Sequence, residues 1–152
     1  MKTAYIVKAY RTAVGKAPKG VFRFKRTDEL AAETIKHMMK ELPNLDPKRI
    51  DDVIVGNAMP EGSQGLNMAR LISLMGLEVI DVPGVTVNRF CSSGVETIGM
   101  ATAKIQAGMA DCIIAGGAES MSSVPRTGFK PELNYDAIVT TGHEDYYWGM
   151  GN

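Results

Sequence analysis

Short apolar runs alternate with helical patterns along residues 1–118, and this alternation limits the fold more than any other feature of the chain. The runs are bounded by turn residues and contain β-branched side chains, which favour extended backbone. The segments between them repeat apolar residues at helical spacing. The expected strands are residues 4–7, 51–56, 85–87 and 112–117, and helices are expected over residues 27–42, over 67–77 and after residue 91. A βαβαβαβ order predicts an α/β fold with a mostly parallel sheet and helices on both faces.

The bounds of these elements follow from capping and stop signals. Thr27 or Asp28 can cap the first helix, and Pro43 stops its pattern. The second helix is expected to end near Gly76, and Gly108 is expected to terminate the third. The runs at 51–56 and 112–117 are apolar throughout, which is typical of strands buried on both faces of a parallel sheet.

The character of the sequence changes at Glu119. Glycines, prolines and scattered aromatic residues interrupt every periodic pattern from there to Asn152. More than about 30 residues without clear elements are unusual at the end of an α/β unit. We therefore expect two parts, a half-domain over residues 1–118 and the start of an inserted loop region over 119–152, in a polypeptide that is incomplete as given.

Composition excludes several classes of protein. Seventeen basic residues balance seventeen acidic ones, so no overall field attracts the chain to nucleic acid or to an anionic membrane. The apolar run between Lys2 and Lys8 is too short for a signal peptide or a membrane span, which predicts a cytoplasmic protein. Two cysteines in a reducing compartment are expected to be free thiols. The widely separated histidines and cysteines have no zinc-ligand spacing, so no metal site is expected.

Cys91 is the strongest candidate for chemistry. It lies between an expected strand and an expected helix, beside Ser92, Ser93 and Gly94, which tolerate a sharp turn. Unpaired N–H groups and the helix dipole stabilise a thiolate at such a position and make it a usable nucleophile. A buried cysteine that only fills the core would not need this setting. Cys112, inside an apolar run, fits that structural role better.

The other candidates are weaker. His37 falls within the first helical pattern and is most simply a partly exposed helix residue. His143, in a loop, could act as a base, but the sequence does not link it to Cys91. Arg89 is equally compatible with a surface or ion-paired role.

Several segments resemble the thiolase family, whose members include acetyl-CoA acetyltransferases and 3-ketoacyl-CoA thiolases. Residues 88–94 (NRFCSSG) resemble the motif of the acyl-enzyme cysteine, and residues 115–122 (AGGAESMS) resemble a second N-terminal signature. Residues 11–15, 62–70 and Met150-Gly151 resemble further family segments, the last of them in the region that touches substrate. Because the segments occur in order with the family's spacing, the resemblance covers the whole chain. It implies an N-terminal portion of a thiolase, with a layered α-β-α fold.

The resemblance implies a specific chemistry. The cysteine of a thiolase attacks the 3-keto carbon of a 3-oxoacyl-CoA, acetyl-CoA departs, and coenzyme A then takes the acyl group; the reverse reaction condenses acetyl-CoA. Cys91 would be this nucleophile, with its backbone N–H as an oxyanion donor, and Met150 would contact substrate. No cofactor is implied beyond the CoA substrates, and family members form homodimers or homotetramers.

The sequence also departs from the family pattern. A thiolase has a histidine that activates the nucleophile and a second cysteine that acts as acid and base, both in a C-terminal half whose motifs do not occur here. The first half would also lack its last strand, which leaves an open sheet edge. The remainder is expected as a continuation or a second chain. Three alternatives remain: a biosynthetic acetoacetyl-CoA-specific thiolase, a non-catalytic thiolase-like binding or scaffold module, and a condensing ketosynthase, which the segment at 119–122 and Arg89 fit less well.

Overall fold

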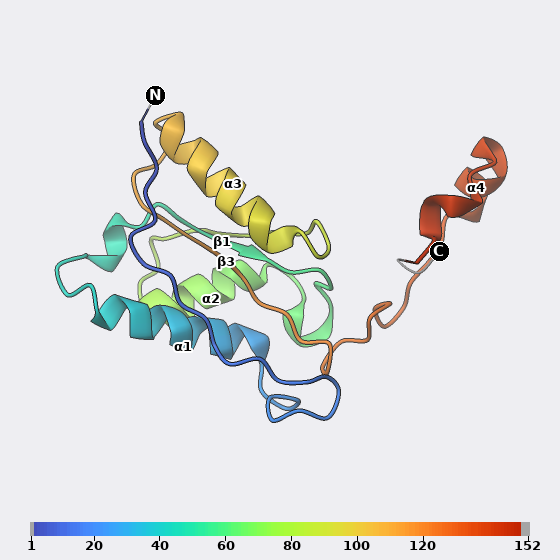
Figure 1. Cartoon of the computed structure of the whole chain (residues 1–152), viewed down its shortest axis with the longest axis horizontal. Coiled ribbons are helices and arrows are strands. Elements are labelled where there is room, and N and C mark those ends of the chain that lie inside the picture. The colour runs from blue at the N-terminus through green and yellow to red at the C-terminus, as the bar shows by residue number, and fades with distance from the viewer. Residues whose placement is uncertain (1, 150–152) are drawn as a thin grey trace.

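Three parallel strands form the central sheet of the computed structural model, which describes residues 2–149 (Figure 1). The strands are β1 (Asp52–Gly56), β2 (Gly84–Val87) and β3 (Ile113–Gly117), in the order β2-β1-β3. Val53 pairs with Gly84 on one side and with Ile114 on the other. The carboxyl ends of all three strands therefore meet at one edge, which we call the carboxyl edge.

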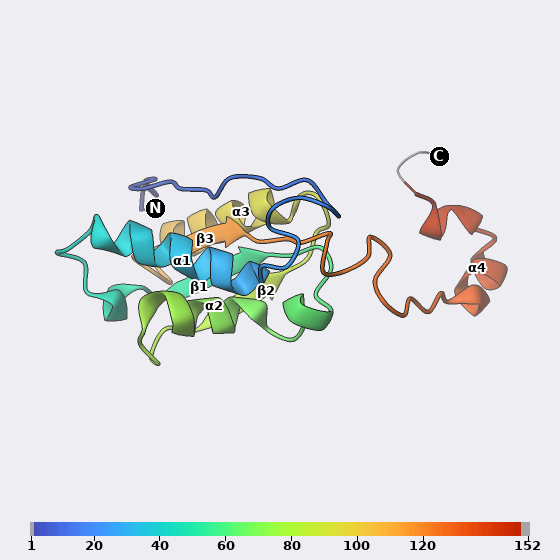
Figure 2. The same cartoon turned by 90° about the horizontal axis from the view of Figure 1, so that it is seen from below.

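Helices cover both faces of the sheet (Figure 2). Helices α1 (Thr27–Lys40) and α2 (Met68–Leu77) pack on each other, and α2 also packs against β1 and β2. Helix α3 (Ser93–Gln106) lies on the opposite face, against β1 and β3. The main core cluster includes Val53, Val55, Met68 and Ile72. This arrangement confirms the predicted α-β-α layering and mostly parallel sheet.

The expected helices form close to their predicted bounds. The chain leaves α2 through Glu78, and Gly108 follows α3 with a φ of +75°, a conformation that suits glycine. The predicted caps of α1 were wrong: the N-cap is Arg26, without a side-chain cap. Thr27 instead donates to Gln64 over 3.0 Å, and Asp28 pairs with Arg26. Tertiary and ion-pair partners outcompete the local capping role of these side chains.

The predicted first strand is absent from the described residues, and the prediction for 4–7 was wrong. Tyr5, Ile6 and Val7 are each at least 75% exposed. The segment is held at its two ends by side chains, with Lys2 bound to Asp111 and Tyr10 to Glu41. β-propensity reflects how well a residue fits a paired surface, and no described strand pairs with this segment.

Strand β1 is buried along its whole length, as predicted, whereas β3 is not. Ile113 to Gly116 are only partly buried and Gly117 is exposed. The prediction of a fully buried strand was wrong here because β3 has a strand neighbour on one side alone within residues 2–149. Two short 3-10 turns, η1 (Pro47–Arg49) and η2 (Gly62–Gln64), flank β1 in the sequence.

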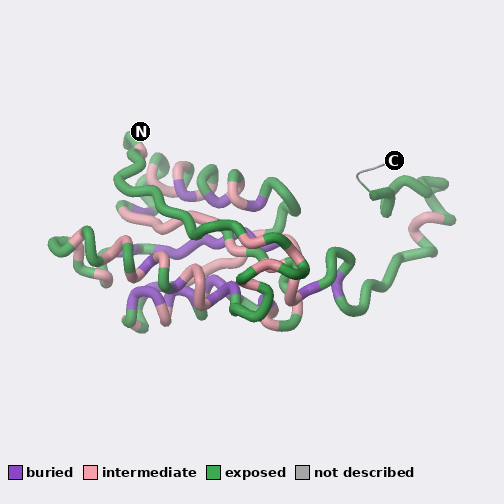
Figure 3. The backbone as a smooth tube through the Cα atoms, turned by 60° about the horizontal axis from the view of Figure 1, so that its bottom comes forward, coloured by how far each residue is buried: buried purple, intermediate pink, exposed green. Residues whose placement is uncertain are grey.

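The C-terminal part, residues 129–149, extends away from the sheet as an arm (Figures 1 and 3). Val124 is still buried, but no residue from 129 to 149 is. The arm contains α4 (Tyr135–Thr141) and η3 (Glu144–Tyr147), where no clear elements were expected. Asn134 caps α4 by accepting from the N–H of Ala137, and Gly142 ends it at a φ of +68°. These two capping residues are the local signals for the helix.

Candidate functional site

Residues 88–92 connect β2 to α3 in a tight turn that carries Cys91, and we call them the Cys91 turn. Ser93 accepts from the N–H of Arg89 over 2.9 Å and donates to the carbonyl of Phe90 over 2.6 Å. Asn88 Oδ1 accepts from the N–H of Phe90 at 2.9 Å. Phe90 itself has a φ of +46°, an unfavourable region for a bulky residue. Polar side chains on both sides of the turn thus hold a strained backbone in place.

Cys91 is exposed at this turn, at the carboxyl edge of the sheet and two residues before the first residue of α3. Its predicted place between strand and helix is confirmed. Arg89 reaches forward from the turn and pairs with Glu96 on the first turn of α3, with Nε and Oε2 at 2.9 Å. This contact agrees with the ion-paired interpretation of Arg89.

A close packing contact fixes the helix start against the sheet. A Cβ atom at Gly56, the last residue of β1, would lie 2.7 Å from the backbone carbon of Ser93. Such a distance is too short for any Cβ contact, so only glycine fits there. The start of α3 therefore sits directly on the end of β1.

Polar side chains continue the carboxyl edge next to the Cys91 turn. Glu119, two residues beyond β3, accepts from Asn57 at 3.1 Å, from the N–H of Ala58 at 2.5 Å and from Gln64 at 2.9 Å. Gln64 is fully buried; its Oε1 accepts from Thr27 and from the N–H of Ser120, and its Nε2 also donates to Met59. The sequence interpretation missed this network. Its signal was present: Asn57, Asn88 and Glu119 each follow a strand closely.

The remaining candidates do not join Cys91. His37 lies in the last turn of α1, 3.4 Å from Glu41, and His143 stacks on Tyr146 in the arm. Among residues 2–149, neither histidine hydrogen-bonds to Cys91, and no cluster of three or more potential metal-ligating side chains is found. Cys112 is half-buried, and burial raises the pKa of its thiol, which makes it a poorer nucleophile. Met150 lies outside the described residues.

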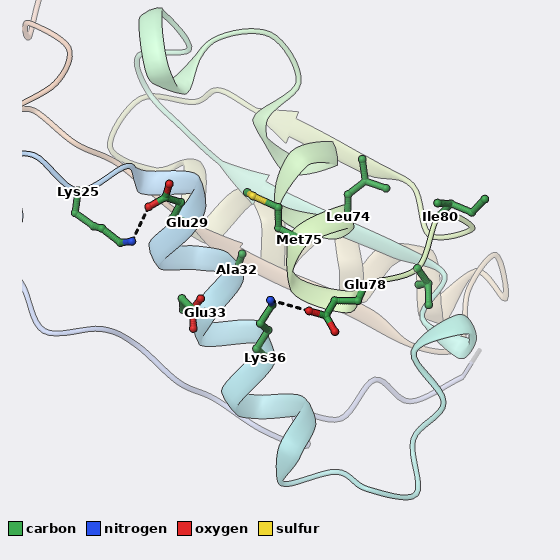
Figure 4. A pocket seen from close by; sticks show the side chains of 10 residues that line it. Lys25, Glu29, Ala32, Glu33, Lys36, Leu74, Met75, Glu78 and Ile80 are labelled. Atoms are coloured by element: carbon green, nitrogen blue, oxygen red, sulfur yellow. Dashed lines mark hydrogen bonds and ion pairs between the residues drawn. The ribbon is translucent and has the colours of Figure 1, made fainter.

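A surface groove of about 490 Å³ lies between α1 and α2 (Figure 4). Residues that line the groove form two ion pairs, Lys25–Glu29 and Lys36–Glu78. None of the lining residues belongs to the Cys91 turn. It is therefore separate from the candidate site. Within residues 2–149, no helix is both long and apolar enough to cross a membrane.

Comparison with known proteins shows where this geometry belongs. The family model described as "Thiolase, N-terminal domain" matches residues 4–142. The chain belongs to the thiolase family. The curated 3-ketoacyl-CoA thiolase of Bacillus subtilis (strain 168) is 46% identical over all 152 residues, and that of Shewanella loihica (strain ATCC BAA-1088 / PV-4) is 42% identical over 93% of the chain. The thiolase chain described here spans only 38% of the length of either relative.

A solved structure agrees with the fold. The crystal structure of the acetyl-CoA acetyltransferase of Bacillus anthracis superposes with a TM-score of 0.63 at 30% identity, covering 76% of this chain and 30% of that one. Thiolases are a family of acyltransferases, and this chain corresponds to an N-terminal part of one. The expected family and the expected fold class are both confirmed.

Proposed function

We propose that the protein is a thiolase that acts on 3-oxoacyl-CoA, with Cys91 as the nucleophile that carries the acyl group. The observation that carries this proposal is the exposed position of Cys91 on a strained, hydrogen-bonded turn at the carboxyl edge. Ligands of open α/β sheets bind at this edge. The 3-ketoacyl-CoA thiolases of Bacillus subtilis and Shewanella loihica, which are similar along nearly the whole chain, support the same reaction.

The chemistry follows from a thiolate in this place. Sγ of Cys91 attacks the C3 carbonyl carbon, the C2–C3 bond breaks, and its electron pair leaves on the acetyl-CoA carbon, which takes up a proton from a general acid. The sulfur of free coenzyme A then attacks the new thioester, takes the shortened acyl group and returns the thiolate of Cys91. The backbone N–H of Cys91 is our proposed donor to the oxyanion of the thioester. The net change moves the acyl group from C2 of the substrate to the sulfur of coenzyme A, and the proton of the CoA thiol replaces it on C2. This change involves no oxidation or reduction, so no cofactor is proposed beyond the CoA substrates.

We further infer that a C-terminal half, as a continuation or as a second chain, supplies the histidine and the second cysteine that handle protons. Relatives of more than twice this length support that inference. An exposed apolar strip on α3 supports it too, because Val95 is 76% and Ile98 is 51% exposed. We propose a cytoplasmic homodimer or homotetramer, in keeping with the family resemblance.

Trapping of the acyl-enzyme tests the role of Cys91. The protein together with its proposed C-terminal half is mixed with acetoacetyl-CoA, quenched in acid, digested and analysed by mass spectrometry. We expect one acetyl group on the peptide that contains Cys91, and Cys91→Ala should lose both this label and CoA-dependent cleavage. Cys112→Ala is the matched control, because it removes the other thiol, and it should retain both. An unlabelled Cys91, or cleavage by Cys91→Ala, would refute the assignment and favour a non-catalytic module.

A second candidate function is the acetoacetyl-CoA-specific reaction, which the similarity to the Bacillus anthracis acetyl-CoA acetyltransferase favours. Both candidates use Cys91 in the same way. Cleavage rates of acetoacetyl-CoA and of longer 3-oxoacyl-CoA substrates, measured with the same assembly, separate them. A degradative enzyme retains kcat/KM as the chain lengthens, whereas an acetoacetyl-CoA-specific enzyme loses it.

A further inference from the structure

A polar side chain closely follows each strand of the sheet at the carboxyl edge. Asn57 follows β1 directly, Asn88 follows β2 directly, and Glu119 follows β3 after one intervening residue. The chemistry proposed above uses the turn after β2. The side chains after β1 and β3 have no part in that chemistry, yet they are joined to the turn by hydrogen bonds.

Glu119 is the acceptor for all three donors at the centre of this edge. Its Oε1 accepts from the side chains of Asn57 and Gln64, and its Oε2 accepts from the N–H of Ala58. Glu119 is exposed, but Asn57 is only 1% exposed and Gln64 is fully buried. The same two amide nitrogens also donate to the carbonyls of Ala118 and Met59. Loss of the acceptor would therefore leave one N–H of each buried amide unpaired, which is more costly than loss of an exposed hydrogen bond.

The backbone of Ala58 extends this contact to the Cys91 turn. While its N–H donates to Glu119, its carbonyl accepts from Asn88 Nδ2 at 3.1 Å. Oδ1 of the same Asn88 side chain accepts from the N–H of Phe90, the residue before Cys91. The backbone of one residue, Ala58, and one amide side chain therefore lie between Glu119 and the strained residue next to the nucleophile.

We propose that Glu119 is a positioning residue for Cys91. It fixes the backbone at Ala58, the Ala58 carbonyl orients Asn88, and Asn88 holds Phe90 in its left-handed conformation. The proposal rests on the proposed function of Cys91. Only a carboxylate fits this place, because both oxygens must accept. A glutamine there would point its NH2 group at a donor, either the N–H of Ala58 or the amides of Asn57 and Gln64.

The rate of alkylation of Cys91 by iodoacetamide tests this without any need for thiolase activity. In Glu119→Gln we expect that rate to fall at least about threefold near neutral pH. The altered turn would no longer hold Sγ of Cys91 beside the N–H groups at the start of α3, and N–H groups at a helix start stabilise negative charge. Peptide mapping follows Cys112 in the same sample. Its rate should not change, whereas general loosening of the fold would expose the half-buried Cys112 and raise its rate.

Glu61→Gln is the matched control. Glu61 also accepts from a backbone N–H, that of Phe129 at 2.6 Å, at the base of the arm and outside the route to Cys91. Its substitution removes the same charge and should leave the Cys91 rate within about twofold. An unchanged or faster Cys91 rate in Glu119→Gln, or an equal fall in Glu61→Gln, overturns the positioning role.

The route through Asn88 is tested by a double-mutant cycle. Asn88→Asp keeps the acceptor for the N–H of Phe90 but loses the donor to the carbonyl of Ala58. It should therefore lower the alkylation rate of Cys91, as Glu119→Gln does. The alkylation rate of Cys91 in the double variant should then lie within about twofold of the rate in either single variant, because both substitutions break the same connection. If the double variant shows the full product of the two single-variant reductions in rate, the two residues act independently, and the proposed connection through Ala58 and Asn88 is overturned. If acyl-enzyme trapping fails while the alkylation rates change as expected, the proposed function is refuted but the positioning role of Glu119 remains. If trapping succeeds while the alkylation rates do not change as expected, only the positioning role is refuted.

Discussion

Gly56 shows how a single residue at the carboxyl edge controls the site. Its missing side chain lets the start of α3 approach β1, since a Cβ there would lie 2.7 Å from Ser93. We predict that Gly56→Ala lowers the free energy of unfolding by about 1–3 kcal/mol, because backbone atoms must move apart. Urea denaturation followed by circular dichroism measures the change.

Gly116 is the matched control for Gly56. It lies in β3, paired with Val55 of β1, but an added Cβ would meet nothing within 4 Å. Gly116→Ala should therefore be neutral or slightly stabilising, by up to about 1 kcal/mol, because it restricts the unfolded chain. Equal destabilisation by both variants would contradict the packing explanation.

The residues of the site differ in how far the sequence reveals them. Cys91 could be found because strand, turn and helix signals are consecutive around it. Glu119 and Gln64 could not, because their roles depend on hydrogen bonds between segments more than 50 positions apart in the chain. A parallel fold gives one usable clue: polar residues that follow successive strands meet at one edge. Applied to Asn57, Asn88 and Glu119, this rule identifies the edge but not the pairing.

At the scale of elements, a carboxylate anchors the start of β3. Asp51 Oδ2 accepts from the N–H groups of Asp111 at 2.7 Å and Cys112 at 3.0 Å. The bond from Cys112, followed by that from Asp111, lowers the pKa of Asp51 from its ordinary value of 3.8. A lowered carboxyl pKa stabilises the folded state above the unfolded-state value, and this contribution is lost as the pH falls through the folded-state value.

We therefore predict a pH-dependent effect of Asp51→Ala. Its melting temperature should lie below that of the unsubstituted protein by a constant amount at neutral and mildly acidic pH. The gap should narrow as the pH falls below about 4, because the wild-type carboxyl then takes up a proton and its hydrogen bonds weaken. Thermal melts across this range measure the gap. A gap that stays constant to the lowest pH at which the protein folds would contradict the role of the charge.

Helices and strands can be predicted from the local sequence only where its pattern agrees with the way the fold buries or pairs that segment. Helix α2 and strand β1 form as predicted because their apolar patterns match the faces that the fold buries. Residues 4–7 have the same strand preference but no described partner strand, and β3 is less buried than its composition indicates. Helix α4 was missed because its evidence is in the caps Asn134 and Gly142 rather than in an apolar pattern.

At the scale of the whole molecule, α3 buries one face on the sheet and exposes apolar residues on another. Its inner face packs Thr97 and Ala101 on the sheet, and its outer face exposes Val95 and Ile98. An exposed apolar strip on a helix is typical of a surface that another part of the protein covers. The proposed C-terminal half is the occupant that the relatives' length supports.

Val95→Ala tests whether the proposed C-terminal half covers the exposed face of α3. In residues 1–152 alone, this variant should be neutral or slightly stabilising, because Val95 is 76% exposed and alanine is the better helix former. In the protein that includes the C-terminal half, we predict a loss of about 1–3 kcal/mol in the free energy of unfolding, because a buried side chain is then truncated. Val124→Ala is the control: Val124 is 1% exposed already, so it should destabilise both forms. If Val95→Ala has the same effect in both forms, the proposed C-terminal half does not cover this face of α3.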